Sequence, residues 1–157
     1  MKFFDDIEIG ARDVLGHHTF TEAEILAFAR AYDPQPFHVD AEAAKRSHFG
    51  ALVASGWHTS ALWIRYLVLS NQRSVAEAKA RGEPVPKIGP SPGFTNLRWL
   101  KPVYVGDTLT YAREIKEKTV SRSRPEWGIL KTYSTATNQH GDLVMDFEGA
   151  VFLERRG

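Results

Sequence analysis

An aspartate and a histidine stand five positions apart in a short segment that contains two prolines. The segment from Asp33 to His38 reads DPQPFH, and its proline rings restrict the backbone so that two side chains can converge on one small molecule. A carboxylate beside an imidazole can take a proton from water and return one to carbon near neutral pH, where histidine titrates. We therefore predict that Asp33 and His38 form an acid–base pair. The structural alternative is that Asp33 caps a turn and His38 packs on the surface.

A serine–glycine pair before a long apolar segment supplies a second candidate feature. Ser55 and Gly56 precede Trp57, and a helix that begins at a glycine leaves backbone N–H groups free and open to a ligand. These amides, with the positive end of the helix dipole, can hold a carbonyl oxygen that gains negative charge. The alternative is that the helix begins with a small residue for packing.

The elements that would position these residues begin with a short strand at residues 14–20. Thr21 and Glu24 then predict a capping box, in which each side chain accepts a backbone N–H of the other. The helix that follows is expected to end near Tyr32, because a residue before Pro34 is disfavoured in helical conformation.

The next part of the chain should lead from the candidate pair to a central helix. Residues 33–38 are expected to form a stiff irregular loop, and Asp40 can cap a short helix through Lys45. The apolar segment that starts near Gly56 predicts a helix with a wide apolar surface, and residues 74–81 either prolong it or form a separate turn. That surface is made by Trp57, Ala61, Ile64, Leu67 and Val68.

The second half of the chain is predicted to be continuous sheet. Residues 82–93 hold four prolines and three glycines and should form a loop, which with the end of the central helix would border the substrate pocket. Four extended segments follow at Phe94–Lys101, Thr108–Val120, Trp127–Asn138 and Leu143–Glu154, the last with apolar side chains at period two. We predict an α+β fold, one antiparallel sheet curled around the helix, in a single domain of residues 1–157.

Composition excludes several classes of protein. Lys plus Arg number 20 and Asp plus Glu number 19, so a nucleic-acid partner is not expected. There is no cysteine, which excludes disulfides, thiolate zinc sites and cysteine nucleophiles. The acidic amino terminus is unlike a signal peptide, and the longest apolar stretch is too short to cross a bilayer. We therefore expect a cytoplasmic protein without a membrane partner.

Several of these segments together resemble a known family. DPQPFHVD from Asp33 to Asp40, the pair Phe49-Gly50 and Ser55-Gly56 before a helix are similar to the MaoC-like dehydratases, relatives of the R-specific enoyl-CoA hydratases. The segments RWLKPV from Arg98 and GDTL from Gly106 resemble the strand-and-turn signature of the same family.

The resemblance implies a hot-dog fold, usually a homodimer, that acts on acyl thioesters of coenzyme A or of acyl carrier protein in fatty acid metabolism. It assigns the catalytic aspartate and histidine to Asp33 and His38, and the carbonyl-polarising backbone N–H to Gly56. No cofactor is implied. The expected activity is a hydro-lyase that reversibly hydrates a 2-enoyl thioester to a 3-hydroxyacyl thioester, by syn addition because both groups lie on one side.

The walls of the implied pocket depart from the family pattern. Gln35 stands where the hydratases usually carry asparagine, Ser55 stands where many carry histidine, and the connection at residues 71–93 is longer than usual. The residues expected to contact substrate are Gln35, Phe37, Ser55, Trp57 and His58. A metal site of His38, His48 and His58 is not expected, because no pattern of carboxylates accompanies these histidines.

Two other functions fit the same residues. A thioesterase on this fold would use similar carbonyl polarisation but direct water at the thioester carbon, and it would release free thiol. A catalytically silent acyl-binding or scaffold subunit would bind the thioester and turn over nothing. Which of Asp33 and His38 acts as base, and which acyl chain is bound, stay open at this stage.

Overall fold

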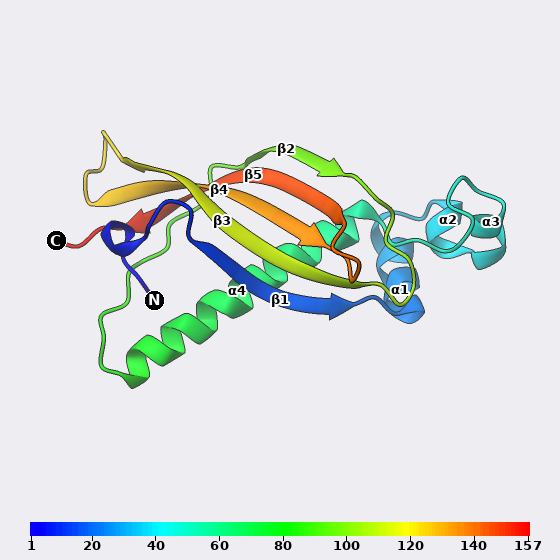
Figure 1. Ribbon diagram of the computed structural model, residues 1–157, viewed down its shortest axis with the longest axis horizontal. Coiled ribbons are helices and arrows are strands. Elements are labelled where there is room, and N and C mark those ends of the chain that lie inside the picture. The colour runs from blue at the N-terminus through cyan, green and yellow to red at the C-terminus, as the bar shows by residue number, and fades with distance from the viewer.

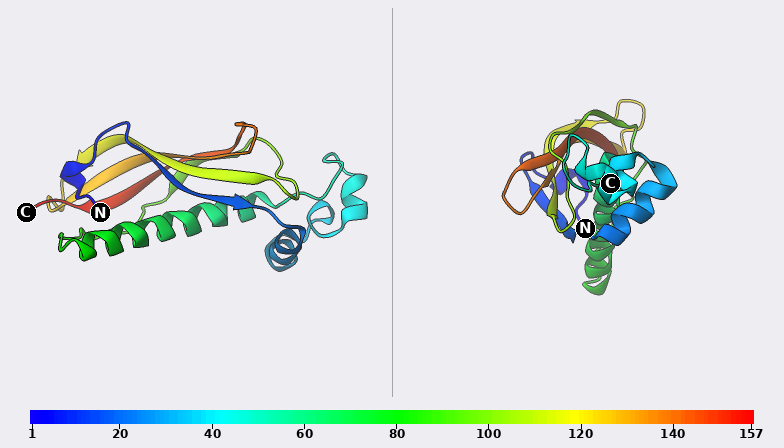
Figure 2. Two further views of the ribbon diagram at one scale, coloured as in Figure 1. Left: turned by 60° about the horizontal axis from the view of Figure 1, so that its bottom comes forward. Right: turned by 90° about the vertical axis from the view of Figure 1, so that its right-hand side faces the viewer.

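Five strands form one antiparallel sheet in the order β1-β3-β4-β5-β2. The computed structural model describes residues 1–157 and shows this sheet curving over the long helix α4, Gly56–Ala80 (Figures 1 and 2). The strands are β1 (Arg12–Thr19), β2 (Phe94–Trp99), β3 (Thr108–Val120), β4 (Trp127–Thr137) and β5 (Leu143–Glu154). The α+β class and the hot-dog arrangement that the sequence predicted are confirmed.

The strand boundaries follow the apolar alternation and the turn residues of the sequence. β3 and β5 have the predicted bounds, and β2 and β4 end slightly earlier than expected. Gly106 and Gly141 adopt positive φ angles of 90° and 82°, which residues with a Cβ disfavour. Both glycines therefore lie at reversals of the chain between strands.

Helix α4 (Gly56–Ala80) spans 25 residues, so the segment after Ser74 prolongs it rather than forming a separate turn. One side of the helix faces the sheet and buries Trp63, whereas Val68 and Leu69 remain exposed. The sheet of one chain thus covers only part of the wide apolar surface.

Gly16 of β1 fixes how closely α4 approaches the sheet. A Cβ at this position would lie 2.2 Å from Cδ1 of Tyr66 on α4, whose ring also stacks on Tyr111 at 5.5 Å. Since the tyrosine is held from both sides, Gly16→Ala is expected to lower the free energy of unfolding by about 1–3 kcal/mol. Denaturant unfolding measures this, and the cost should shrink when Tyr66 is replaced by leucine. An equal cost in both backgrounds would contradict the packing explanation.

Three short helices lie beside the N-terminal end of α4 (Figure 1). They are α1 (Glu22–Tyr32), α2 (Pro36–Val39) and α3 (Ala41–Lys45), and a 3₁₀ turn, η1 (Phe4–Asp6), precedes β1. Asp40 caps α3 as predicted, since its carboxylate accepts the N–H groups of Glu42 and Ala43 at 2.8 and 3.0 Å. This cluster of helices carries the candidate acid–base pair.

Two local predictions were wrong. Residues 36–39 form one helical turn instead of an irregular loop, because a proline at the first helical position has a suitable φ and lacks only an N–H that would be unpaired there. Only half of the capping box forms. Thr21 Oγ1 accepts the N–H of Glu24 at 3.3 Å, but the Glu24 carboxylate accepts the Thr21 hydroxyl instead of the Thr21 N–H, and it also contacts His18 Nε2.

None of the helices is both long and apolar enough to cross a membrane.

Candidate active site

The predicted acid–base pair is assembled where α1 ends and α2 begins. Asp33 is the C-cap of α1, and its N–H donates to the carbonyl of Ala29 at 2.8 Å. Oδ2 of Asp33 lies 3.4 Å from Nε2 of His38, and the two side chains are 17% and 8% exposed. Two titratable groups therefore meet in a nearly closed site.

The opposite side of the His38 ring is fixed by a backbone carbonyl. Nδ1 lies 2.7 Å from the carbonyl oxygen of Val53, which can only accept, so Nδ1 carries the proton in the neutral ring. The N–H of Val53 in turn donates to the carbonyl of Phe37 at 3.3 Å. This anchoring leaves the lone pair of Nε2 directed toward the Asp33 carboxylate.

Two donors hold the Asp33 carboxylate. The hydroxyl of Ser55 donates to Oδ2 at 2.7 Å and the amide of Gln35 donates to Oδ1 at 2.8 Å. Burial raises the pKa of Asp33, but these hydrogen bonds and the neighbouring His38 lower it by more, so the pKa lies below the usual aspartate value. Asp33 is therefore an ionised acceptor at neutral pH.

Removing one donor should raise the pKa of Asp33. In Ser55→Ala the carboxylate loses the hydroxyl bond to Oδ2, so its charged form is less stabilised. Carbon NMR of the Asp33 carboxyl over a pH titration measures the change, with Ser47→Ala as a control because that hydroxyl donates to the carbonyl of Ala44. The folded pKa is depressed, so ionised Asp33 stabilises the fold above its usual pKa, and this contribution is lost as pH falls through the folded pKa. An unchanged or lower pKa in Ser55→Ala would contradict this account of the site.

Gly56 begins α4 directly beside this pair. Ser55 is the N-cap, and its hydroxyl oxygen accepts the N–H of Trp57 at 3.2 Å while it donates to Asp33. The N–H of Gly56 belongs to the first turn, where no earlier carbonyl of the helix can accept it. A Cβ on Gly56 would lie 2.4 Å from Cδ2 of Trp99, so this position accepts no side chain while the tryptophan is in place.

The other residues expected to contact substrate lie in two different surroundings. Phe37 packs edge-to-face on His38 with ring centroids 4.5 Å apart, and Trp57 is half exposed and meets Trp99 at 4.9 Å. His58 is buried elsewhere, because its ring stacks on Phe28 at 4.5 Å under α1. Burial lowers the pKa of His58, which favours the neutral ring.

Sequence reasoning missed two parts of the site. The Val53 carbonyl that orients His38 is a backbone group, so its residue type carries no signal. Trp99 of β2 covers Gly56 and donates its indole N–H to Ser60 at 3.2 Å, although it lies far from both in the sequence. Only the folding of β2 against the start of α4 brings these residues together.

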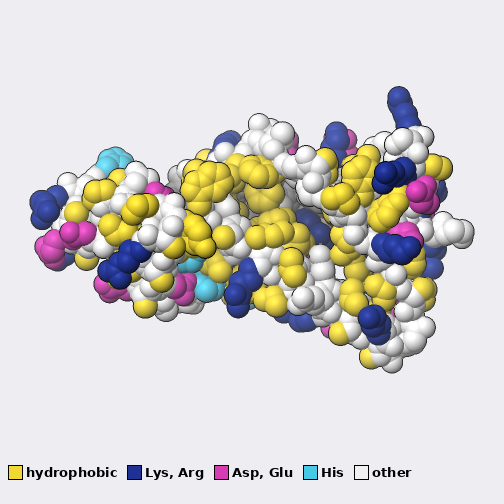
Figure 3. Space-filling view, turned by 180° about the vertical axis from the view of Figure 1, so that it is seen from behind, with side chains coloured by type: hydrophobic (Ala, Val, Ile, Leu, Met, Phe, Trp, Pro, Cys, Tyr) yellow, Lys and Arg dark blue, Asp and Glu magenta, His cyan; other side chains and the backbone are white.

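A cavity of about 780 Å³ extends from the start of α4 along the space between this helix and the sheet. Figure 3, which views the molecule from behind, shows hydrophobic side chains gathered around a hollow in this face. Trp57 and Ser60 line the end next to Gly56, whereas Asp33 and His38 lie outside the lining. Ile88 and Ser91 of the proline-rich loop and Glu77 near the end of α4 also line it, so the expected segments border a cavity.

Comparison with known proteins gives one consistent result. The family model described as "MaoC like domain" matches residues 11–137. The crystal structure of a MaoC-like dehydratase from Rhodospirillum rubrum superimposes with a TM-score of 0.82 at 36% identity, covering 100% of this chain and 99% of that one. The uncharacterized protein YdeM of Bacillus subtilis is 30% identical over 132 residues, which are 84% of each chain. R-hydratase PhaJ1 from Pseudomonas aeruginosa shares the fold, with a TM-score of 0.66 at 22% identity over 98% of this chain and 86% of that one.

Proposed function

Because the chain belongs to the MaoC-like dehydratase family, we propose that it reversibly hydrates a 2-enoyl thioester to a 3-hydroxyacyl thioester. The observation that carries the proposal is the pair of acceptors, Asp33 Oδ2 and His38 Nε2, 3.4 Å apart beside the first turn of α4. A water molecule that donates one hydrogen to each acceptor would be held and oriented between them.

The N–H of Gly56 polarises the thioester carbonyl. It lies at the positive end of a 25-residue helix, where a backbone donor favours a carbonyl oxygen that gains negative charge. Electron density is thereby drawn from the double bond, and the β-carbon becomes open to attack by water. Ser55 links this donor to the pair, since its hydroxyl bonds both Asp33 and the first turn of α4.

His38 acts as the base in this proposal. Asp33 holds its charge tightly through two donors, and its lowered pKa makes it a weak base. Nε2 of His38 carries a lone pair, because Nδ1 donates to Val53. His38 therefore accepts a proton from water while Asp33 orients that water and stabilises the imidazolium that forms.

The atoms and electrons balance without a cofactor. The water O–H bond breaks, its oxygen forms a bond to the β-carbon, and its proton passes to Nε2. The π electrons of the double bond then form the α-carbon–hydrogen bond with the proton from Nε2, and neutral His38 is restored. Both new bonds form on the face of the substrate that meets the pair, so the addition is syn.

The active form in this proposal is a homodimer in the cytoplasm, and its thioester partner is coenzyme A or acyl carrier protein. Exposed apolar side chains on α4, such as Val68 and Leu69, support a second copy against this helix. The edge strand β2 pairs on one side only, with β5, so its other side is available for another strand. Of the predicted contacts, Gln35, Phe37 and Ser55 support the pair and Trp57 lines the cavity, whereas His58 is buried under α1, away from the cavity lining.

Turnover of a panel of 2-enoyl-CoA esters of rising chain length tests the proposal. Hydration is followed by loss of the conjugated thioester absorbance, and free thiol is measured in parallel. We expect absorbance loss without thiol release. Thiol release would instead establish a thioesterase, and binding of the esters without either change would establish a silent acyl-binding subunit.

A further inference from the structure

Several buried polar atoms of the sheet and of α4 have no hydrogen-bond partner. They include Arg113 Nε, Ser134 Oγ and, on the helix itself, Trp63 Nε1. Arg113 of β3 and Ser134 of β4 are direct partners in the antiparallel register, and Asp13 of β1 pairs with Arg113 from the other side. Folded proteins satisfy nearly all buried polar atoms, so this group indicates that a ligand or ordered water completes it.

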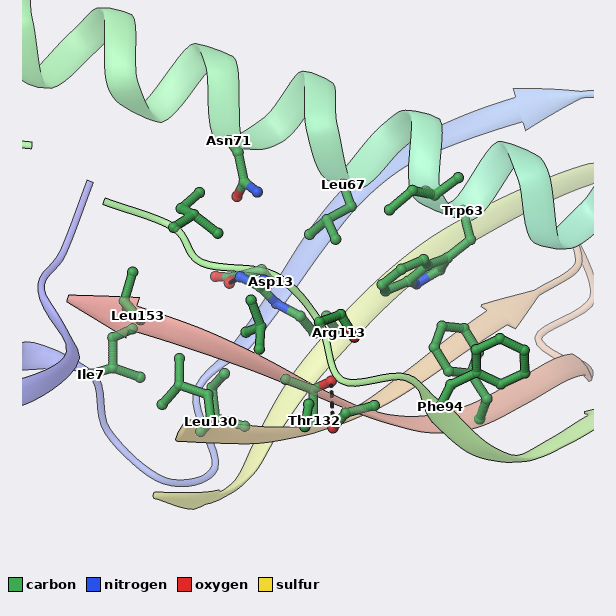
Figure 4. A pocket seen from close by; sticks show the side chains of 18 of the residues that line it. Ile7, Asp13, Trp63, Leu67, Asn71, Phe94, Arg113, Leu130, Thr132 and Leu153 are labelled. Atoms are coloured by element: carbon green, nitrogen blue, oxygen red, sulfur yellow. Dashed lines mark hydrogen bonds and ion pairs between the residues drawn. The ribbon is translucent and has the colours of Figure 1, made fainter. Parts of the chain in front are cut away.

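Trp63 and Arg113 both line the cavity that begins beside Gly56. Figure 4 shows Trp63 on the helix side and Arg113 with Asp13 on the strand side of the same space. Trp63 is only 9% exposed, and Phe147 holds its ring at 4.7 Å. Trp63 follows Gly56 by seven residues on α4, which corresponds to about 10 Å along the helix. The unpartnered atoms therefore lie well beyond a double bond next to a carbonyl held at Gly56.

The chemistry of these atoms selects the kind of group that would complete them. The Nε–H of arginine and the indole N–H can only donate, so they require an acceptor such as oxygen. Asp13 neutralises the guanidinium, since its Oδ2 accepts from the outer nitrogen of Arg113 at 3.0 Å. An acceptor without charge fits this balance better than a carboxylate, which would face Asp13.

We propose that the cavity recognises an acyl chain that carries an uncharged oxygen function, a hydroxyl or a carbonyl, between Trp63 and Arg113. The rest of the chain would lie against the apolar lining from Leu67, Leu97 and Phe147. This inference rests on the proposed function, because it places the thioester carbonyl at Gly56. It names a substrate class: enoyl thioesters that are oxygenated far from the reacting double bond.

The test measures binding separately from turnover. Saturated medium-chain acyl-CoA esters of one length, which have no double bond to hydrate, are titrated calorimetrically into the full chain. One ester is plain alkyl, one carries a terminal carboxylate, and the others carry a single hydroxyl at successive positions. At one distal position we expect the hydroxyl ester to bind about tenfold tighter than the alkyl ester, as for one satisfied buried hydrogen bond.

Three variants assign the effect to the named atoms. Trp63→Phe removes the indole N–H and keeps an aromatic ring, and Arg113→Lys removes Nε–H and keeps a charge opposite Asp13. Each should abolish most of the tenfold preference. Trp127→Phe is the matched control, because Trp127 begins β4 and is absent from the cavity lining. It should retain the preference.

The outcomes separate this inference from the proposed function. The inference is overturned if the wild-type protein binds the alkyl and hydroxyl esters with equal affinity, or binds neither. Water would then be the partner of the unpartnered atoms. Tightest binding of an ester with a terminal carboxylate overturns it as well, as does an equal loss of affinity for both esters in Trp63→Phe. Hydration of plain enoyl esters without any preference overturns the inference alone, whereas a preference without hydration overturns only the proposed function.

Discussion

Asp33→Asn and His38→Ala should each lower the rate of enoyl-CoA hydration by ~10²–10⁴-fold, the usual contribution of a positioned acid or base. The asparagine keeps the size of the side chain but loses the charge that stabilises the imidazolium. The alanine removes the imidazole ring, whose Nε2 accepts the proton from water in the proposed reaction. The measurement is kcat from the loss of conjugated absorbance under saturating substrate.

The double variant distinguishes a coupled pair from two independent groups. Because both side chains act on one water molecule, the loss in the double variant should be far smaller than the product of the single losses. Thermal unfolding should shift only modestly, since neither side chain belongs to the main hydrophobic core, although Asp33→Asn also removes a charge that stabilises the fold. Near-normal rates in both single variants of an active enzyme would exclude Asp33 and His38 as the catalytic pair.

Matched substitutions control for changes of the same type elsewhere. Asp40→Asn alters the N-cap of α3, where asparagine caps as well as aspartate, and His140→Ala removes an exposed histidine from a turn. Both should hydrate enoyl-CoA at close to the wild-type rate. A loss like that of Asp33→Asn in either control would point to a general effect on the helical cluster or the sheet.

Gly56→Pro should reduce kcat by ~10²–10³-fold relative to Gly56→Ala when both are made in a Trp99→Ala background. Proline lacks the N–H assigned to the thioester carbonyl, and alanine retains it. The background is required because a Cβ on Gly56 would meet the Trp99 ring at 2.4 Å. Both variants add a Cβ, so their comparison isolates the loss of the N–H.

The backbone around Gly56 tolerates this proline. Gly56 is the first residue of α4, a position where proline has a suitable φ and removes no helical hydrogen bond. Ser55 has φ −58° and ψ 140°, an extended conformation that is allowed before proline. Equal kcat values for the two variants, with circular dichroism spectra that match, would show that the Gly56 N–H takes no part in the reaction.

Local sequence determined most of the secondary structure, because short-range signals specify it. Apolar alternation at period two and the turns at Gly106 and Gly141 gave the bounds of β3 and β5. Asp40 caps α3 and α4 begins at Gly56, as the sequence predicted. The one-turn helix at residues 36–39 was not predicted. Two prolines indicate that the segment is rigid, but they fit an irregular loop and a helical turn equally well.

The sequence by itself determined the residue types of the site, and the tertiary structure decided how they meet. Asp33 and His38 are near each other in any fold, since a constrained segment joins them. Their orientation depends on Val53 and Ser55, which reach them from a distant segment, and Trp99 arrives over Gly56 only when β2 joins the sheet. The row of Asp13, Arg113 and Ser134 likewise requires the register of three strands. Such contacts depend on sheet pairing and side-chain packing between segments far apart in the chain, which local residue patterns do not specify.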